Sequence, residues 1–166
     1  TLVRDYLAAF GPASAADVQA FTGLGAMKSV LKAMGDELEI LTDESGRELF
    51  DLPGAPLPDA DVPAPPRFLP EFDSLVLAHK DRSRLLPDEH KGKIVTKNLR
   101  VRATFLWEGA VSGTWRIERR KQVATLEIAP FAKLPKGARK ALAEEGEALV
   151  RFAEEDAESL VVKFDT

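Results

Sequence analysis

Residues 101–128 read VRATFLWEGAVSGTWRIERRKQVATLEI, and this stretch decides the fold of the second half of the chain. Apolar and polar side chains alternate over residues 101–107, and the apolar set resumes over residues 111–117. Alternation with a period of two is typical of half-buried strands, and the segment 108–110 between them predicts a three-residue hairpin loop. A third strand is predicted over residues 123–128. The sequence therefore predicts an antiparallel β-meander.

Other elements are predicted on both sides of the meander. A long helix is expected over residues 136–155, with Leu142, Leu149 and Phe152 on one face, and a last strand over residues 160–164. Upstream, a short strand is expected at residues 67–70. The segment from Leu52 to Pro66 holds six of the eleven prolines, which predicts an extended, semi-rigid linker.

The first fifty residues predict three helices followed by a β-hairpin. Ser14 is a good N-cap for the second helix, and a turn over residues 43–46 separates two short strands. Three helices and a hairpin in this order are typical of a winged helix. We therefore predict an α+β fold with a winged helix at 1–52, a Pro-rich linker at 53–66 and a mixed α+β domain with a basic surface at 67–166.

Composition excludes several classes of protein. The chain has 166 residues, of which 45% are hydrophobic and 30% charged, with no cysteine and two histidines. A disulfide framework, a thiolate metal site and a histidine-rich metal cluster are therefore excluded, and no cofactor or metal is expected. No apolar run is long enough for a membrane helix, so no membrane partner is expected. A cytoplasmic location is the default expectation, and the absence of cysteine fits an oxidising compartment equally well.

Charge is distributed unevenly along the chain. The net charge is −4, yet the stretch from His79 to Lys121 holds twelve basic and five acidic residues. Such a block predicts a footprint for a polyanion, and the alternative is a solvated face balanced by acidic neighbours. The predicted polyanion-binding residues are Arg82, Arg84, Lys91, Lys93, Lys97, Arg100, Arg102, Arg116, Arg119, Arg120 and Lys121. Residues 1–60 hold four basic and ten acidic residues, which disfavours a duplex and favours a protein partner for the winged helix.

Strand parity predicts that Arg102 faces Arg116 across the hairpin. Two arginines in direct opposition repel each other unless an anion or a carboxylate lies between them. A phosphate is one candidate for that position, and Asp81 or Glu127 is the other. The following turn, at residues 118–122, is expected to present three cations at a hairpin tip.

The segment RFLPEFDSLVL at residues 67–77, which runs into DRSRLL at 81–86, resembles a bacterial winged-helix DNA-binding family that includes the crosslink-unhooking DNA glycosylases. The motifs GTWR at 113–116 and IAPF at 128–131 are similar to that family too. The resemblance spans nearly the whole chain and corresponds to the C-terminal part of longer family members. We therefore expect this chain to be a truncated form of such a protein, and the resemblance implies a concave, basic DNA-binding face.

The same resemblance places a Gln-x-Gln or Gln-x-Asp motif for glycosylase activity nearer the N-terminus. Gln19 is followed two residues on by Phe21, and Gln122 by Ala124, so neither matches. No catalytic residue is therefore assigned, and whether the chain is an enzyme stays open. The expected function is duplex DNA binding as the C-terminal part of a glycosylase-like repair protein. The alternative is a non-catalytic winged-helix protein that mediates protein contact or regulation.

Overall fold

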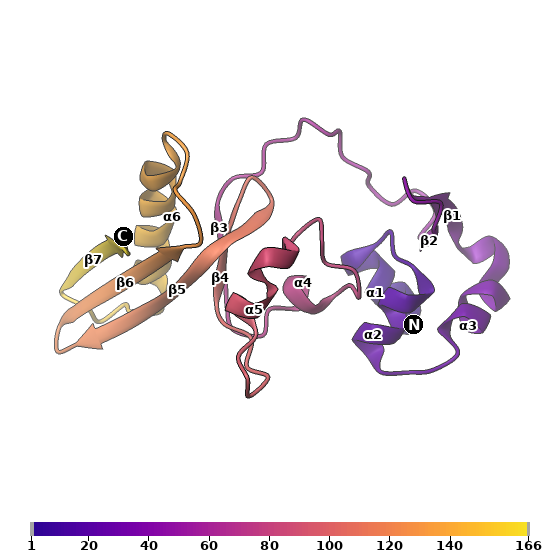
Figure 1. Cartoon of the computed structure of the whole chain (residues 1–166), viewed down its shortest axis with the longest axis horizontal. Helices are drawn as coiled ribbons and strands as arrows, with labels where there is room; N and C mark the ends of the chain where they lie inside the picture. The colour runs from indigo at the N-terminus through magenta and orange to yellow at the C-terminus, as the bar shows by residue number, and fades with distance from the viewer. Residues whose placement is uncertain (1, 166) are drawn as a thin grey trace. The chain divides into compact units, whose positions relative to one another are not determined.

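The computed structural model describes residues 2–165, which form six α-helices, two 3-10 helices and seven strands in two sheets (Figure 1). This confirms the predicted α+β class. Contacts divide the chain into two compact units. The first unit runs to Val62 and adds Ser74–Arg82, and the second comprises Pro63–Asp73 and the chain from Ser83 onward. No helix within residues 2–165 has the length and apolarity needed to cross a membrane.

The first unit contains three helices followed by a hairpin, in the predicted order. Its elements are α1 (Leu2–Phe10), α2 (Ala15–Thr22), α3 (Met27–Met34), η1 (Gly35–Glu37), β1 (Glu39–Thr42), β2 (Glu48–Asp51) and α4 (Ser74–Leu77). Residues 52–66 contain no helix or strand. The interpretation of these elements as a winged helix with a linker stays a prediction.

Local sequence explains where the helices of the first unit begin and end. Ser14 caps α2 as predicted, and it forms a capping box with Asp17. Gly23 ends α2 in the left-handed conformation at φ 71°, which glycine adopts without steric cost. Leu7 of α1 and Leu31 of α3 are buried together with Phe50 of β2 in one core.

The second unit is built on a five-stranded sheet in the order β3-β4-β5-β6-β7. Its elements are β3 (Arg67–Leu69), η2 (Asp88–His90), α5 (Lys91–Ile94), β4 (Thr104–Trp107), β5 (Ala110–Arg120), β6 (Val123–Pro130), α6 (Ala138–Ala153) and β7 (Ser159–Phe164). The first four strands pair antiparallel, which confirms the meander. The last strand pairs parallel with β6 after the α6 crossover.

One face of this sheet is covered by α6. Leu142, Gly146 and Val150 lie one helical turn apart and are buried. A Cβ on Gly146 would lie 2.5 Å from Leu126 Cδ2, so the glycine allows close approach of helix and sheet. The expectation that Phe152 shares the buried face is wrong, because its side chain is 80% exposed. Phe152 lies two residues beyond Val150, which corresponds to a rotation of about 200° around the helix. Its side chain therefore points away from the buried face.

The β4–β5 hairpin differs from the predicted one. The turn has two residues and pairs Trp107 with Ala110, so the expected three-residue loop is wrong. A bulge at Ser112 then shifts the register and places Thr104 opposite Thr114. The extra residue of the bulge compensates for the shorter turn. The pairing of Thr104 with Thr114 therefore agrees with the prediction, although the length of the turn does not.

Candidate nucleic-acid interface

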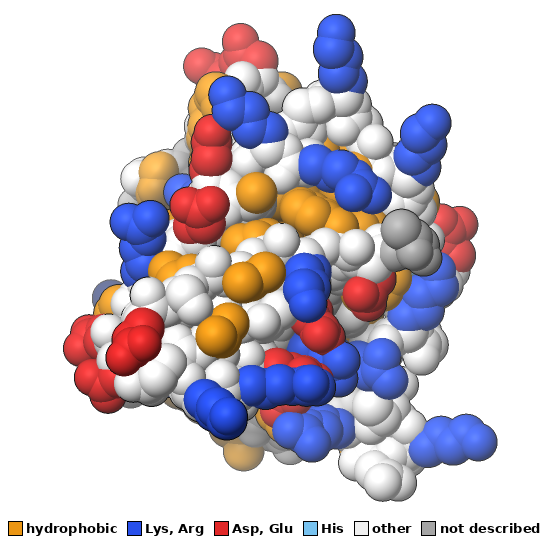
Figure 2. All heavy atoms as spheres, turned by 90° about the vertical axis from the view of Figure 1, so that its left-hand side faces the viewer, with side chains coloured by type: hydrophobic (Ala, Val, Ile, Leu, Met, Phe, Trp, Pro, Cys, Tyr) orange, Lys and Arg blue, Asp and Glu red, His pale blue; other side chains and the backbone are white. Residues whose placement is uncertain are grey.

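The eleven basic residues predicted to bind a polyanion are divided between the two units, with Arg82 in the first and ten in the second. Several of them are held by ion pairs: Lys91 with Asp88, Arg100 with Glu71, Arg116 with Glu118 and Glu127, Arg119 with Glu154, and Arg120 with Glu118. On the face shown in Figure 2, Lys and Arg side chains are intermingled with Asp and Glu. The candidate interface therefore depends on the cations that form no ion pair with a carboxylate.

Three of the predicted residues have side chains without any hydrogen-bond or ion-pair partner in the described range 2–165. Lys97, Arg102 and Lys121 make no hydrogen bond or ion pair through their side chains with another residue of the described range 2–165. All three are exposed. Lys97 and Arg102 lie on the same short connection between α5 and β4, whereas Lys121 lies at the β5–β6 turn. Uncommitted charge is therefore concentrated before β4.

A hollow of about 510 Å³ lies beside this connection, on the sheet face opposite α6. Arg100 and Arg102 reach it from the α5–β4 connection, and Arg116 reaches it from the middle of β5. The acidic residues of its lining are Glu71, Glu127 and Asp165. We call this the arginine hollow. It brings together three predicted DNA-binding residues, two from the α5–β4 connection and one from β5.

Arg116 is held within the arginine hollow by two carboxylates. Its Nη2 lies 2.5 Å from Glu127 Oε2, and Glu127 is its direct neighbour across the β5–β6 pair. Glu118 Oε1 lies 3.2 Å from the same nitrogen. The hydrogen bond that Arg116 donates to Glu127, followed by the charges of both carboxylates, raises the pKa of Arg116. The carboxylate named as the alternative to a phosphate thus lies beside this arginine.

Arg102 is placed differently from the sequence prediction. The β4–β5 ladder begins only at Thr104, so Arg102 is not paired with Arg116 across the strands. The Arg102 backbone N–H instead donates to the Ile94 carbonyl oxygen at 3.1 Å. The predicted cross-strand pair is therefore wrong, because the chain turns from the sheet toward α5 before reaching it. Both guanidinium groups nevertheless line the arginine hollow.

The tip of the β5–β6 hairpin carries less free charge than predicted. Arg119 is drawn back along the hairpin, with Nη1 at 3.0 Å from Glu154 and Nε donating to the Lys121 carbonyl oxygen at 2.7 Å. Arg120 lies 3.3 Å from Glu118. Of the three cations at this tip, Lys121 alone lacks a side-chain partner within residues 2–165.

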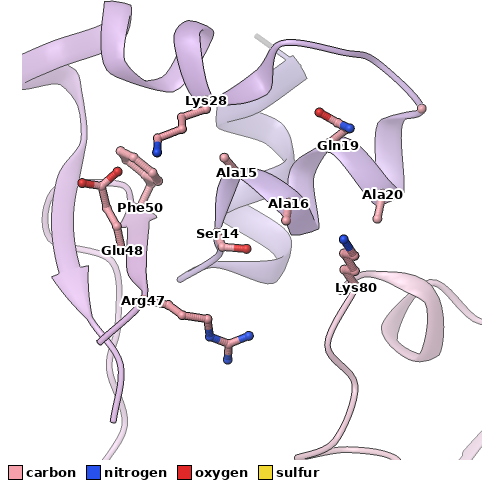
Figure 3. A pocket seen from close by; sticks show the side chains of 11 residues that line it. Ser14, Ala15, Ala16, Gln19, Ala20, Lys28, Arg47, Glu48, Phe50 and Lys80 are labelled. Atoms are coloured by element: carbon pink, nitrogen blue, oxygen red, sulfur yellow. The ribbon is translucent and has the colours of Figure 1, made fainter. Parts of the chain in front are cut away.

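A second hollow, of about 770 Å³, lies in the first unit, and sequence reasoning did not predict it. Figure 3 shows Lys28, Arg47 and Lys80 around it, each from a different segment. Arg47 is engaged by Asp43 and Asp81, at 2.6 and 3.0 Å. The backbone and guanidinium of Arg47 lower the pKa of Asp43 to about 2. The small side chains on the α2 wall are Ala15, Ala16 and Ala20.

Both hollows contain cationic side chains, and in the arginine hollow these lie beside an equal number of carboxylates. Guanidinium groups bind phosphate oxygens in a bidentate manner, and lysine adds a point charge. Within residues 2–165, no three His, Asp or Glu side chains are grouped so that they could hold a metal ion. Sequence reasoning missed two features: the hollow of the first unit, and the absence of a side-chain partner for Arg102 within the described range. Both depend on how segments that are separate in the sequence contact one another.

Comparisons with known proteins identify relatives of the chain. A family profile described as "DNA glycosylase AlkZ-like" matches residues 1–152. The solved structure of Streptomyces sahachiroi DNA glycosylase AlkZ aligns with a TM-score of 0.77 and 24% sequence identity, which shows a shared fold. The alignment covers 98% of this chain and 44% of that chain, so the chain spans less than half the length of that protein. A comparison with curated protein sequences found no match.

Proposed function

The chain belongs to the AlkZ-like family of DNA glycosylases, and we propose that its own part in such a repair protein is to hold duplex DNA through the second unit. The observation that carries this proposal is the unpartnered Arg102 in the arginine hollow, with Lys97 on the same connection. The other two arginines of this hollow, Arg100 and Arg116, are held by carboxylates. Arg102 and Lys97 are therefore available to a phosphate backbone.

Base excision itself is assigned to no residue of this chain. The motif that the family resemblance associates with activity does not occur at Gln19 or Gln122. The role proposed for the second unit is positional, because contacts to phosphates fix the register of a protein on DNA without reading sequence. We expect a cytoplasmic location for a protein with this role.

Removing both uncommitted cations is expected to make duplex binding less dependent on salt. Each lost phosphate contact lowers the slope of log K against log salt by about 0.9 for a duplex. The double variant Lys97→Ala/Arg102→Ala should therefore lose a slope of about two, because neither change breaks an internal ion pair. Titration of the purified chain against a short duplex at several salt concentrations measures the effect.

The matched control is Lys133→Ala/Lys136→Ala, which removes two exposed lysines without side-chain partners in the described range. It changes the net charge equally and should leave the slope close to that of the parent. Equal slopes for the parent and the Lys97/Arg102 variant would contradict the proposed interface. A slope lowered by Lys28→Ala/Lys80→Ala instead would move the interface to the first unit.

A role in protein contact is the second candidate function. It is favoured by the four basic and ten acidic residues of positions 1–60, a balance that repels phosphate. A chain that binds no duplex at low salt would support this candidate over DNA binding.

A further inference from the structure

The connection between α5 and β4 ends in a tight turn with an exposed leucine. Thr96 N–H donates to the Arg100 carbonyl oxygen at 2.9 Å, and Leu99 N–H donates to the Thr96 carbonyl oxygen at 2.9 Å. Below the turn, Val95 and Val101 form a β-bridge. The Leu99 side chain is 79% exposed. Figure 1 shows this connection projecting beyond the end of β4.

The backbone of Leu99 is strained. Its φ is 57°, a left-handed conformation that leucine rarely adopts because Cβ approaches the following carbonyl oxygen. A large apolar side chain that is both exposed and strained adds nothing to the stability of the fold. Such a combination is found where the surrounding structure holds a residue in place for a function.

The turn is fastened to the rest of the second unit. Arg100 Nη2 lies 2.8 Å from Glu71 Oε2, and Phe72 N–H donates to the Val101 carbonyl oxygen at 3.2 Å. Phe72 is itself half exposed and has a φ of 57°. Two strained, exposed apolar residues thus lie on adjoining segments, each next in sequence to a residue that lines the arginine hollow.

The charges around Leu99 indicate which partner it meets. Lys97 and Arg102 have no carboxylate partner within residues 2–165, whereas Arg100, in the same few residues, is paired with Glu71. The central part of a protein–protein interface is depleted of charge, whereas a contact to DNA is rich in basic residues. An apolar tip between cations therefore fits a nucleic acid better than a protein.

We propose that Leu99 is a wedge that inserts between base pairs of a duplex while the cations beside it hold the phosphates. This inference rests on the proposed function, because it requires the second unit to bind duplex DNA. Apolar wedges in other DNA-binding proteins enter a base step, partly unstack it and kink the helix. The fixed left-handed turn presents the side chain without further ordering on binding.

The test uses the whole chain and a set of short duplexes that carry 2-aminopurine at successive central positions. Fluorescence of this base rises when it is unstacked, so the parent should give a rise at one step of the bound duplex. Leu99→Ala should abolish the rise and weaken binding by roughly tenfold, with an unchanged salt slope. Leu99→Asn should do the same while folding at least as stably as the parent, because asparagine tolerates the left-handed conformation.

The control is Phe152→Ala, which removes an equally exposed apolar side chain on α6 and should leave both the fluorescence rise and the affinity unchanged. A parent that binds the duplex with no fluorescence rise at any position overturns the wedge and leaves the proposed function standing. The same is true if both Leu99 variants keep the parental rise. Absence of duplex binding by the parent overturns the proposed function and the wedge together.

Discussion

Replacing Gly113 with alanine is expected to destabilise the second unit by about 3 kcal/mol. A Cβ at this position would lie 2.3 Å from Phe105 Cε1 and 2.4 Å from the Ala129 carbonyl oxygen. Phe105 is completely buried, and Ala129 belongs to the β5–β6 ladder. Neither neighbour can move without loss of packing or strand pairing. Urea denaturation followed by tryptophan fluorescence measures the effect, because both tryptophans of the chain, at 107 and 115, lie in the second unit.

The matched control for this substitution is Gly92→Ala, in the same unit. A Cβ on Gly92 meets no atom within 4 Å. Alanine within the α5 helix should therefore be neutral or slightly stabilising. A denaturation midpoint for Gly113→Ala equal to that of the parent would show that the sheet accommodates the methyl group and would contradict the prediction.

The strands were predictable from the sequence because their alternation reflects burial on one face. The bulge at Ser112 was not predictable in this way. The turn is one residue shorter than predicted and the bulge adds one residue, so the strand pairs beyond the bulge are the same with or without both changes. The exposed position of Phe152 was missed because Gly146, an apparently poor core residue, occupies the helix stripe that packs on the sheet. Patterns thus identified the elements, while close contacts between them determined the details.

The candidate site was predictable only in part. The basic block drew attention to Arg102 and Arg116, and parity placed them near each other. Which arginine forms an ion pair depends on carboxylates from other segments. Glu127 of the next strand pairs with Arg116, and Glu71 pairs with Arg100, which is 29 residues away in the sequence. The exposure and the left-handed backbone of Leu99 follow from the turn geometry. No periodicity in the sequence records either of them.

A buried carboxylate holds the segment 78–82 on the first unit. Asp17 is 6% exposed and accepts three hydrogen bonds, from the Ser14 N–H at 2.8 Å, the Ser14 hydroxyl at 2.6 Å and the Lys80 N–H at 2.9 Å. The Tyr6 hydroxyl donates to the Ala78 carbonyl oxygen at 2.7 Å in the same region. Asp17 thus joins the start of α2 to the backbone of Lys80, a residue that lines the first-unit hollow.

Asp17→Asn is expected to destabilise the first unit by about 2 kcal/mol at neutral pH, because an amide cannot accept all three hydrogen bonds. Burial by itself would raise the pKa of Asp17, but the hydrogen bonds from Ser14 and Lys80 and the charge of His79 lower it below its ordinary value. A lowered pKa in the folded state means that the unfolded chain binds more protons, so this stabilisation is complete above the ordinary aspartate pKa of about 3.9. It is lost as the pH falls through the lower folded value.

The parent and Asp17→Asn should therefore differ most at neutral pH and converge in acid. Urea denaturation at several pH values, followed through the absorbance of Tyr6, measures this, because Tyr6 is the only tyrosine of the chain and lies in the first unit. Asp59→Asn removes the same charge at an exposed position of the segment 52–66, which contains no helix or strand. This control should follow the parent at every pH. A difference between parent and Asp17→Asn that stays constant down to the acid limit would show that the charge of Asp17 contributes nothing and that only the shape of its side chain matters.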